Sequence, residues 1–161
     1  MAEVINSLQF DDIEFEDELR KLIETRIAED DVYNIFNKEV NLIPFDDTVK
    51  KETQFPAITI SVVNPLPYSA TQEDIQIQAH TSFTVELNVY TSGENRKRNN
   101  RKLSNILIAL LQSNGSVGKY YNRGLVVSEF TELSYDVDKV SRWVIRMRGL
   151  CDNRLNLIYS I

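Results

Sequence analysis

The chain has 161 residues, a formal net charge of −6 and a sequence pI of about 4.9. With 42% apolar and 26% charged residues it has the composition of an ordinary globular protein, and we expect one domain over residues 1–161. An acidic chain is a poor general binder of nucleic acid, because phosphate binding requires clustered Lys and Arg side chains, although a local basic patch is compatible with this charge.

The single cysteine, Cys151, excludes an intrachain disulfide bond and favours a reduced, intracellular setting. The first residues lack the basic and apolar regions of a secretory signal, so we expect none. No stretch approaches the roughly 18 consecutive apolar residues of a membrane span, and we expect no membrane partner.

The first 31 residues are strongly acidic, with eleven Asp and Glu against three Lys and Arg. Within them, five apolar side chains recur at helical spacing: Phe15, Leu19, Leu22, Ile23 and Ile27. This pattern predicts an amphipathic helix over residues 16–29, whose acids form either a solvated face or a site for a basic partner. We expect residues 1–14 to be extended or docked on a partner, and the run from Val32 to Val40 is β-prone.

Two strands are predicted next along the chain. After a polar connection over residues 41–55, the run from Ala57 to Val63 alternates apolar and polar side chains as a strand does. Residues 64–73 predict a loop with two prolines and with Tyr68 at its tip, either packed as an anchor or placed for contact with a partner. A longer strand over residues 74–91 follows, and we expect the two strands to pair as an antiparallel hairpin.

The longer strand has two different faces, because successive side chains of a strand point to opposite sides. Its odd positions are nearly all apolar: Ile75, Ile77, Ala79, Thr81, Phe83, Val85, Leu87 and Val89. Its even positions run from Gln76 and Gln78 through His80 to Tyr90, and Glu86 is their one charged residue. The even face is either a surface buried against another protein or a solvated sheet face.

A second amphipathic helix is predicted over residues 95–112, because Leu103, Ile106, Leu107, Leu110 and Leu111 form a helical stripe. Its first half carries a basic run of five side chains: Arg96, Lys97, Arg98, Arg101 and Lys102. This run has three interpretations: a nucleic-acid-binding site, a solvated helix end, or a contact with the acidic first helix of a neighbouring copy. Opposite patches on one chain are compatible with a head-to-tail ring.

The last third of the chain reads as a loop and strands. Residues 116–122 predict a loop, and a strand begins at Leu125 and runs toward Tyr135. Residues 139–150 alternate again and predict a closing strand hairpinned with the previous one, while the period of two in residues 153–161 predicts an edge strand or a segment docked on a neighbour. The predicted fold is α+β, an antiparallel sheet with a long hairpin covered on one face by two amphipathic helices.

The sequence shows no catalytic or metal-binding pattern. His80 is the only histidine, the only cysteine is far from it in sequence, and no glycine-rich phosphate-binding motif occurs. The acidic stretch at residues 11–18 lacks the glycine and the terminal glutamate of a calcium-binding loop. We therefore expect no enzyme activity, no cofactor and no bound metal.

The order of the elements and four short stretches carry a resemblance to a known family. The stretches are FPAITI at residues 55–60, NVYTSG at 88–93, RKLSNILIALL at 101–111 and DKVSRWVIRMRG at 138–149. Over about residues 17–150, the chain resembles the tail terminator, or tail completion, proteins of long-tailed bacteriophages and related head-to-tail joining proteins.

The resemblance implies a non-enzymatic virion protein, assembled in the host cytoplasm, whose copies form a ring, usually a hexamer. Such a ring ends the tail tube and joins it to the head connector. The implied partners are further copies of the chain, the major tail tube protein and a head connector or neck protein, with DNA only as the passing genome. The resemblance and the basic run together suggest these interface residues: Tyr68, Gln76, Gln78, His80, Glu86, Arg96, Arg98 and Arg101.

Overall fold

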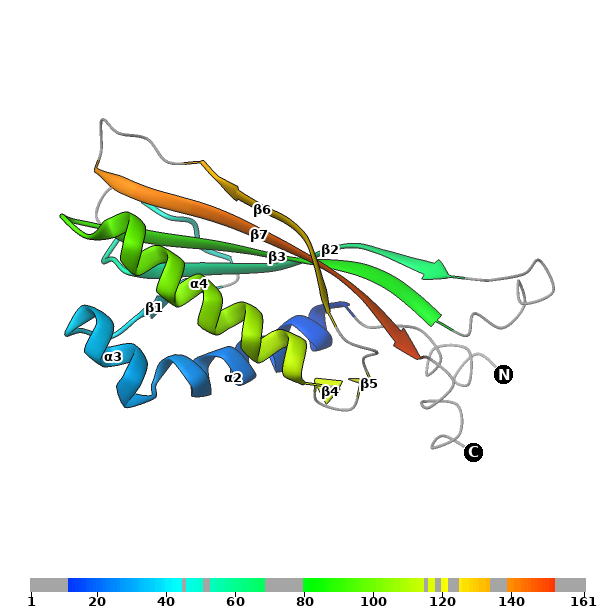
Figure 1. Ribbon diagram of the computed structural model, residues 1–161. Helices are drawn as coiled ribbons and strands as arrows, with labels where there is room; N and C mark the ends of the chain where they lie inside the picture. Colours follow the sequence, from blue (N-terminus) through cyan, green and yellow to red (C-terminus); the bar gives the residue numbers. More distant parts are fainter. Residues whose placement is uncertain are drawn as a thin grey trace.

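We describe the protein from a computed structural model, which covers residues 12–44, 46–50, 53–68, 80–114, 116–117, 120–121, 125–133 and 139–152. Within these residues, a five-stranded sheet is covered on one face by helices (Figure 1). The strands of the sheet are β1 (Asn41–Leu42), β2 (Ala57–Tyr68), β3 (His80–Ser92), β6 (Val126–Glu132) and β7 (Val140–Asp152).

The strands lie in the order β1-β2-β3-β7-β6. β1 runs parallel to β2, and the other neighbouring pairs are antiparallel. β2 and β3 form the predicted long hairpin, in which pairing runs from Ala57 with Tyr90 to Tyr68 with His80. β7 pairs with β6 as expected and also with β3 along its whole length, so the predicted closing strand lies inside the sheet.

Helices α2 (Asp12–Ile27) and α4 (Arg96–Ser113) lie on the same face of the sheet (Figure 1). Helix α2 packs on β2, and α4 packs on β3 and β7. The apolar stripes of the helices and the odd positions of β3 are buried together: Phe15, Leu19, Ile23, Leu103, Leu107, Leu111, Phe83, Val85, Leu87 and Val89. The predicted α+β fold is confirmed.

A buried amide ties α4 to the two central strands. Asn100 is fully buried, and its Nδ2 donates to the carbonyl oxygens of Val89 on β3 (2.8 Å) and Ser141 on β7 (3.1 Å). Its Oδ1 accepts a hydrogen bond from the hydroxyl of Ser104 (3.0 Å). Because an unpaired buried polar group costs free energy, this bonded amide favours one position of the helix on the sheet.

The β-prone run predicted at residues 32–40 is wrong as a strand, because it begins inside a helix. Helix α3 spans Asp30–Phe36, and two acids in its first turn suit the positive end of the helix dipole. Asn37 follows with a φ of 55°, a left-handed conformation that asparagine tolerates at a helix end. Val32, Ile35 and Phe36 share one helical face, a spacing that outweighs the β propensity of Val and Ile.

The loop prediction is wrong for residues 64–68, because β2 continues to Tyr68. The register shifts between Val63 and Leu66, and beyond this bulge Leu66 and Tyr68 pair with β3. Alternate residues of a strand direct their main-chain groups to opposite edges, so Pro65 and Pro67 face away from β3. Proline has no N–H to donate, and an outward position on an edge strand tolerates it.

Side chains of α2 cover the edge of β2 where β1 ends. Glu16 is buried, and its Oε1 accepts a hydrogen bond from the N–H of Val62 (2.9 Å). Arg20 donates to the carbonyl oxygens of Ile43 (2.7 Å) and Ile60 (3.1 Å). The helix therefore satisfies main-chain groups that a longer β1 would otherwise bond.

Residues 116–122 were predicted as a loop, and the structure places two short antiparallel strands there, β4 (Ser116–Val117) and β5 (Tyr120–Tyr121). Of the predicted terminal segments 1–14 and 153–161, residues 1–11 and 153–161 lie outside the described residues, as do residues 74–79 of the predicted long strand. The prediction that residues 12–14 are extended is wrong, because α2 begins at Asp12. No helix in the described residues is long and apolar enough to cross a membrane.

A glycine on β7 makes room for the ring of Phe83 on β3. A Cβ atom added to Gly149 would lie 2.4 Å from Cζ of Phe83 and 2.6 Å from Cδ2 of Leu125. The ring of Phe83 also meets that of Phe15 on α2, with centroids 4.8 Å apart. The bare backbone of Gly149 thus allows one aromatic ring to join the sheet to the first helix.

We expect Gly149→Ala to lower the free energy of unfolding by about 1–3 kcal/mol, because the added methyl group overpacks the core. Urea denaturation measures this change. The double variant Gly149→Ala/Phe83→Leu removes the ring atoms that clash, so it should be destabilised by less than the sum of the two single variants. Unchanged stability of Gly149→Ala would contradict this account of the packing.

Candidate functional site

The face of the sheet opposite the helices is covered by no element among the described residues (Figure 1). It carries the even positions of β3, on which Thr84, Glu86 and Tyr90 are partly exposed. It also carries the even positions of β7, because β7 pairs with β3 in register. We call this surface the polar face and define it by these described residues: Thr84, Glu86, Asn88, Tyr90, Ser128, Glu129, Arg142, Arg146 and Arg148.

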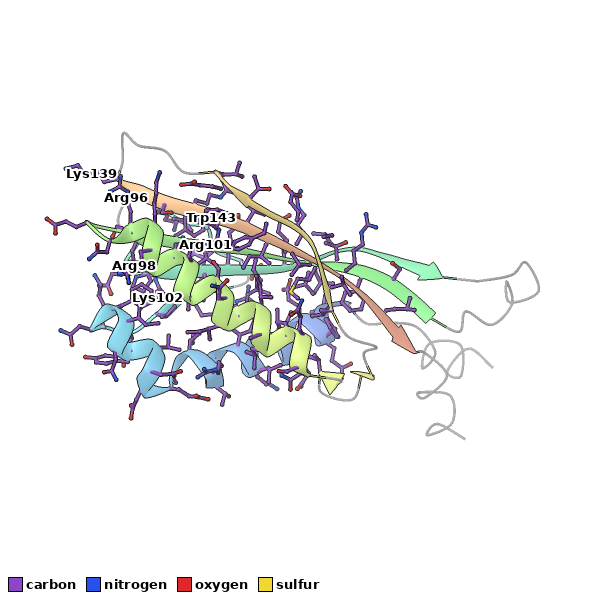
Figure 2. All side chains as sticks on the ribbon, in the orientation of Figure 1. Arg96, Arg98, Arg101, Lys102, Lys139 and Trp143 are labelled. Atoms are coloured by element: carbon purple, nitrogen blue, oxygen red, sulfur yellow. The ribbon has the colours of Figure 1, made fainter. Side chains whose placement is uncertain are left out.

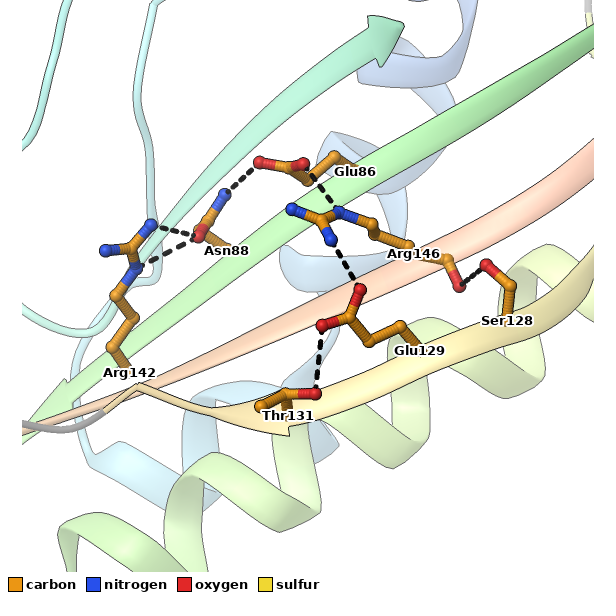
Figure 3. A network of polar contacts seen from close by, with 7 residues as sticks. All are labelled: Glu86, Asn88, Ser128, Glu129, Thr131, Arg142 and Arg146. Carbon is orange, nitrogen blue, oxygen red and sulfur yellow. Dashed lines mark hydrogen bonds and ion pairs between the residues drawn. The ribbon is translucent and has the colours of Figure 1, made fainter.

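A network of hydrogen bonds and ion pairs crosses the polar face (Figure 3). Arg146 on β7 donates from Nε to Oε2 of Glu86 on β3 (3.0 Å), and its Nη1 pairs with Glu129 on β6. Asn88 donates from Nδ2 to Glu86 (3.3 Å) and accepts two hydrogen bonds from Arg142, at 3.0 and 2.9 Å. Side chains therefore connect three neighbouring strands on this face.

The network is balanced in charge, because it contains two arginines and two glutamates: Arg146 pairs with both glutamates, and Arg142 bonds to Asn88. The hydrogen bonds to Glu86 and then Glu129 raise the pKa of the Arg146 guanidinium above its ordinary value. Arg148 is exposed and has no hydrogen bond or ion pair among the described residues. The network borders an open hollow of about 510 Å³, lined by Val63, Thr84, Glu86, Ser128, Glu129, Arg146 and Arg148.

The structure places three of the predicted interface residues along the hairpin: Tyr68, His80 and Glu86. Glu86 lies in the network of the polar face. Tyr68 and His80 form a cross-strand pair near the end of the hairpin that projects past the helices (Figure 1), and their side chains lie outside the described set. Gln76 and Gln78 lie outside the described residues altogether.

Part of the basic run is used within the chain. Figure 2 shows Arg101 of α4 beside Trp143 of β7, and its guanidinium lies 5.1 Å from the centroid of that ring and 5.0 Å from that of Phe130. Lys97 reaches Glu132 on β6, with a nitrogen–oxygen distance of 3.6 Å. These two cations therefore hold β6 and β7 against α4, a role that sequence reasoning missed.

The other three basic side chains of the run differ in whether they have a partner among the described residues. Arg96 donates from Nη1 to the carbonyl oxygen of Gly93 (3.2 Å), at the turn that leads from β3 into α4. Arg98 and Lys102 are exposed and have no hydrogen bond or ion pair among the described residues (Figure 2). Only these two members of the run present an uncommitted positive charge.

Some of the acidic side chains in and between α2 and α3 form ion pairs with a basic side chain of the same region. Arg26 on α2 pairs with Glu29 and Asp31, and its hydrogen bond to Asp31 lowers the pKa of that carboxyl group below its ordinary value. Near this pair, an open hollow of about 520 Å³ is lined by Glu24, Ile27, Ala28, Asp30, Tyr33, Glu39, Val40, Asn41, Leu42 and Gln54. No group of three metal-ligating side chains occurs among the residues that the structure describes.

Among the described residues that line the two hollows there is no histidine and no cysteine, and the hydroxyl of Ser128 donates to the carbonyl oxygen of Arg146 (3.1 Å). The paired side chains of the polar face suit contact with another macromolecule. Sequence reasoning missed the arginines of β7 as part of this face, although the alternation of Arg142, Arg146 and Arg148 was a usable signal.

Comparison with known proteins finds similarity in fold to solved structures. No protein-family model matches the sequence, and no curated protein matches it. The fold is similar to that of a chain in the solved virion of a native gene transfer agent particle, with a TM-score of 0.54. The match covers 83% of this chain and 91% of that chain, at 9% sequence identity. The two chains therefore share a fold across most of their lengths.

We expect Arg101→Ala to destabilise the protein more than Arg98→Ala does. Arg101 loses its contacts with two aromatic rings, worth about 0.5–1 kcal/mol each at a partly exposed site, whereas Arg98 loses no described partner. Thermal denaturation measures the stability of both variants. The two substitutions remove the same charge and the same side-chain atoms from one helix, so they are directly comparable. Equal stability of the two variants would contradict the packing role of Arg101.

Proposed function

We propose that the protein is a structural subunit of a phage-like virion, whose copies form a ring that ends the tail tube and joins it to the head connector. The observation that carries the proposal is the fold shared with a chain of a gene transfer agent virion over 83% of this chain. The resemblance to tail terminator proteins supports the position at the end of the tail and a ring of six subunits. The proposed partners are other copies, the tail tube protein and the head connector.

The polar face has properties that suit burial against another protein. Burying a charge is costly unless the charge is paired and hydrogen-bonded. Glu86, Glu129, Arg142 and Arg146 already have partners on this face, so a second protein can cover it without leaving these groups unpaired.

The hairpin of β2 and β3 supplies a second contact surface. It projects past the helices (Figure 1), and the predicted interface residues Tyr68 and His80 pair across it. An exposed strand pair on a rigid sheet is well placed to reach a neighbouring subunit or the last ring of the tube. We propose that the hairpin, with Gln76 and Gln78 beyond it, makes this contact.

The charged helices support a contact between unlike surfaces of neighbouring copies. Arg98 and Lys102 carry free positive charge on α4, while α2 and α3 expose several acids, among them Glu24 and Asp30. Such a heterologous contact closes into a ring when its rotation allows. The alternative, nucleic-acid binding by the run from Arg96 to Lys102, is weakened because Lys97 and Arg101 serve internal contacts.

The assembly of the full chain tests the proposal. We expect mass photometry to detect a ring-sized species in the purified protein, alone or with tail tube protein added, and electron microscopy to show it at tube ends. Thr84→Lys should reduce this species, because it adds a cation beside Arg148 on the polar face without touching the core. Thr48→Lys makes the same change at an exposed site on the connection before β2 and should leave assembly intact.

The outcomes separate the two candidate functions. A monomer at every protein and salt concentration, also with tube protein present, contradicts the ring. Retention on single- or double-stranded DNA at low salt that is lost when Arg98 and Lys102 become Ala would favour the nucleic-acid-binding alternative. Circular dichroism of each variant checks that the fold is retained.

A further inference from the structure

The two edges of the sheet differ in whether they can accept another strand. Along β2, from its first residue to its last, three features prevent another strand from pairing with the outer edge. These are β1, the side chains of Glu16 and Arg20, and the main-chain nitrogens of Pro65 and Pro67, which point outward and carry no hydrogen. The other edge is β6, which pairs only with β7 among the described strands. A free strand edge is a template for pairing with another chain unless the structure blocks it.

The main-chain groups of β6 show which positions are open. The N–H of Leu133 donates to the carbonyl oxygen of Arg142 on β7 (2.8 Å), so Leu133 and Thr131 direct their main-chain groups inward. Because these directions alternate along a strand, Phe130 and Glu132 direct theirs outward, where no described strand meets them. A strand added there would gain hydrogen bonds at these positions.

Exposed apolar side chains mark the same edge. The described part of the chain exposes four large apolar side chains, and two of them are Val126 at 66% and Leu133 at 43%. One begins β6 and the other directly follows it. Single exposed apolar residues are ordinary, but two at opposite ends of one open edge fit a strand that lies along it.

The chain itself contains a segment with the pattern of such a strand. Residues 153–161 follow β7, and their alternate positions are apolar: Leu155, Leu157, Tyr159 and Ile161. These residues lie outside the described structure. The N-terminal residues 2–10 also alternate, but Ile5 and Asn6 interrupt their period of two, whereas only Ile158 interrupts that of residues 155–161, so the C-terminal segment is the better candidate.

The register favours a neighbouring copy over the same chain as the source of this segment. Val126, the first residue of β6, pairs with Arg148, and β7 continues to Asp152 beyond that point. A segment that continues from Asp152 therefore begins past Arg148, the residue that pairs with the start of β6. To reach its own β6 edge it would have to reverse and pass the chain at Leu125, which is buried beside Gly149.

We propose that residues 153–161 of one copy add as a strand to the outer edge of β6 in a neighbouring copy. The inference rests on the self-assembly part of the proposed function and names the contact that links one subunit to the next. Main-chain hydrogen bonds to Phe130 and Glu132 hold the strand, and its apolar side chains cover Val126 and Leu133.

Mixed disulfide formation between two tagged chains tests the contact directly. Both chains carry Cys151→Ser; one carries Thr131→Cys on β6, and the other carries Leu155→Cys, Leu157→Cys or Tyr159→Cys to sample neighbouring registers. We expect mild oxidation to give a disulfide between differently tagged chains. Disulfides only within a chain, in a protein that carries both cysteines, would overturn the proposal, as would none at any register.

Two substitutions of Glu132 on the β6 edge, made in the full chain, test whether its outward N–H is needed for self-association. Glu132→Pro removes the outward N–H, whereas Glu132→Ala keeps it and loses the same ion pair with Lys97. We expect Glu132→Pro, Leu157→Asp and deletion of residues 153–161 each to weaken self-association by about tenfold or more, and Glu132→Ala to have little effect. Circular dichroism identifies any variant that fails to fold, and the disulfide test does not depend on that variant.

The result also separates this inference from the proposed function. Rings that form equally well without residues 153–161 would overturn the strand contact and leave the ring standing. Disulfides between chains that produce only dimers would support the strand contact and contradict the ring.

Discussion

Burial of the odd positions of β3 is the constraint on which the rest of the structure depends. Phe83, Val85, Leu87 and Val89 are almost fully buried, in one core with the apolar stripes of α2 and α4. Since side chains alternate along a strand, the even positions of β3 point outward when its odd positions are covered. A shift of one residue in the pairing register would exchange the buried and the outward side chains. The position of both helices and the exposure of the polar face therefore follow from the same pattern.

In the described sheet, one edge and one face are covered by other parts of the chain, and the other edge and face are not. This asymmetry supports the proposed assembly. One edge is closed by side chains of α2 and by prolines, and one face is closed by helices. Among the described residues, no helix or strand covers the polar face or the outer edge of β6. A subunit of a ring needs such uncovered surfaces, because a neighbour must contact each copy on unlike sides.

The folded chain uses its charged side chains differently from what their positions in the sequence suggest. The basic run looks like one patch in the sequence, yet Lys97 and Arg101 hold β6 and β7 against α4, so Arg98 and Lys102 remain free. The arginines of β7 look unremarkable in the sequence, yet Arg146 lies between Glu86 and Glu129 on neighbouring strands. Partners from other strands decide which charges are available to another molecule.

The sequence by itself determined the α+β class, both amphipathic helices, the hairpin and the polar side of its long strand, because these depend on periodicity within one segment. It did not reveal helix α3, where three apolar positions carry too little periodic signal, or the extension of β2 through Pro65 and Pro67. It also did not place β7 beside β3, so it missed the charge-balanced network that joins Glu86 to Arg146. Only the tertiary structure decided these features, because they depend on which strands become neighbours and which edges stay open, and pairings between distant segments leave no local pattern.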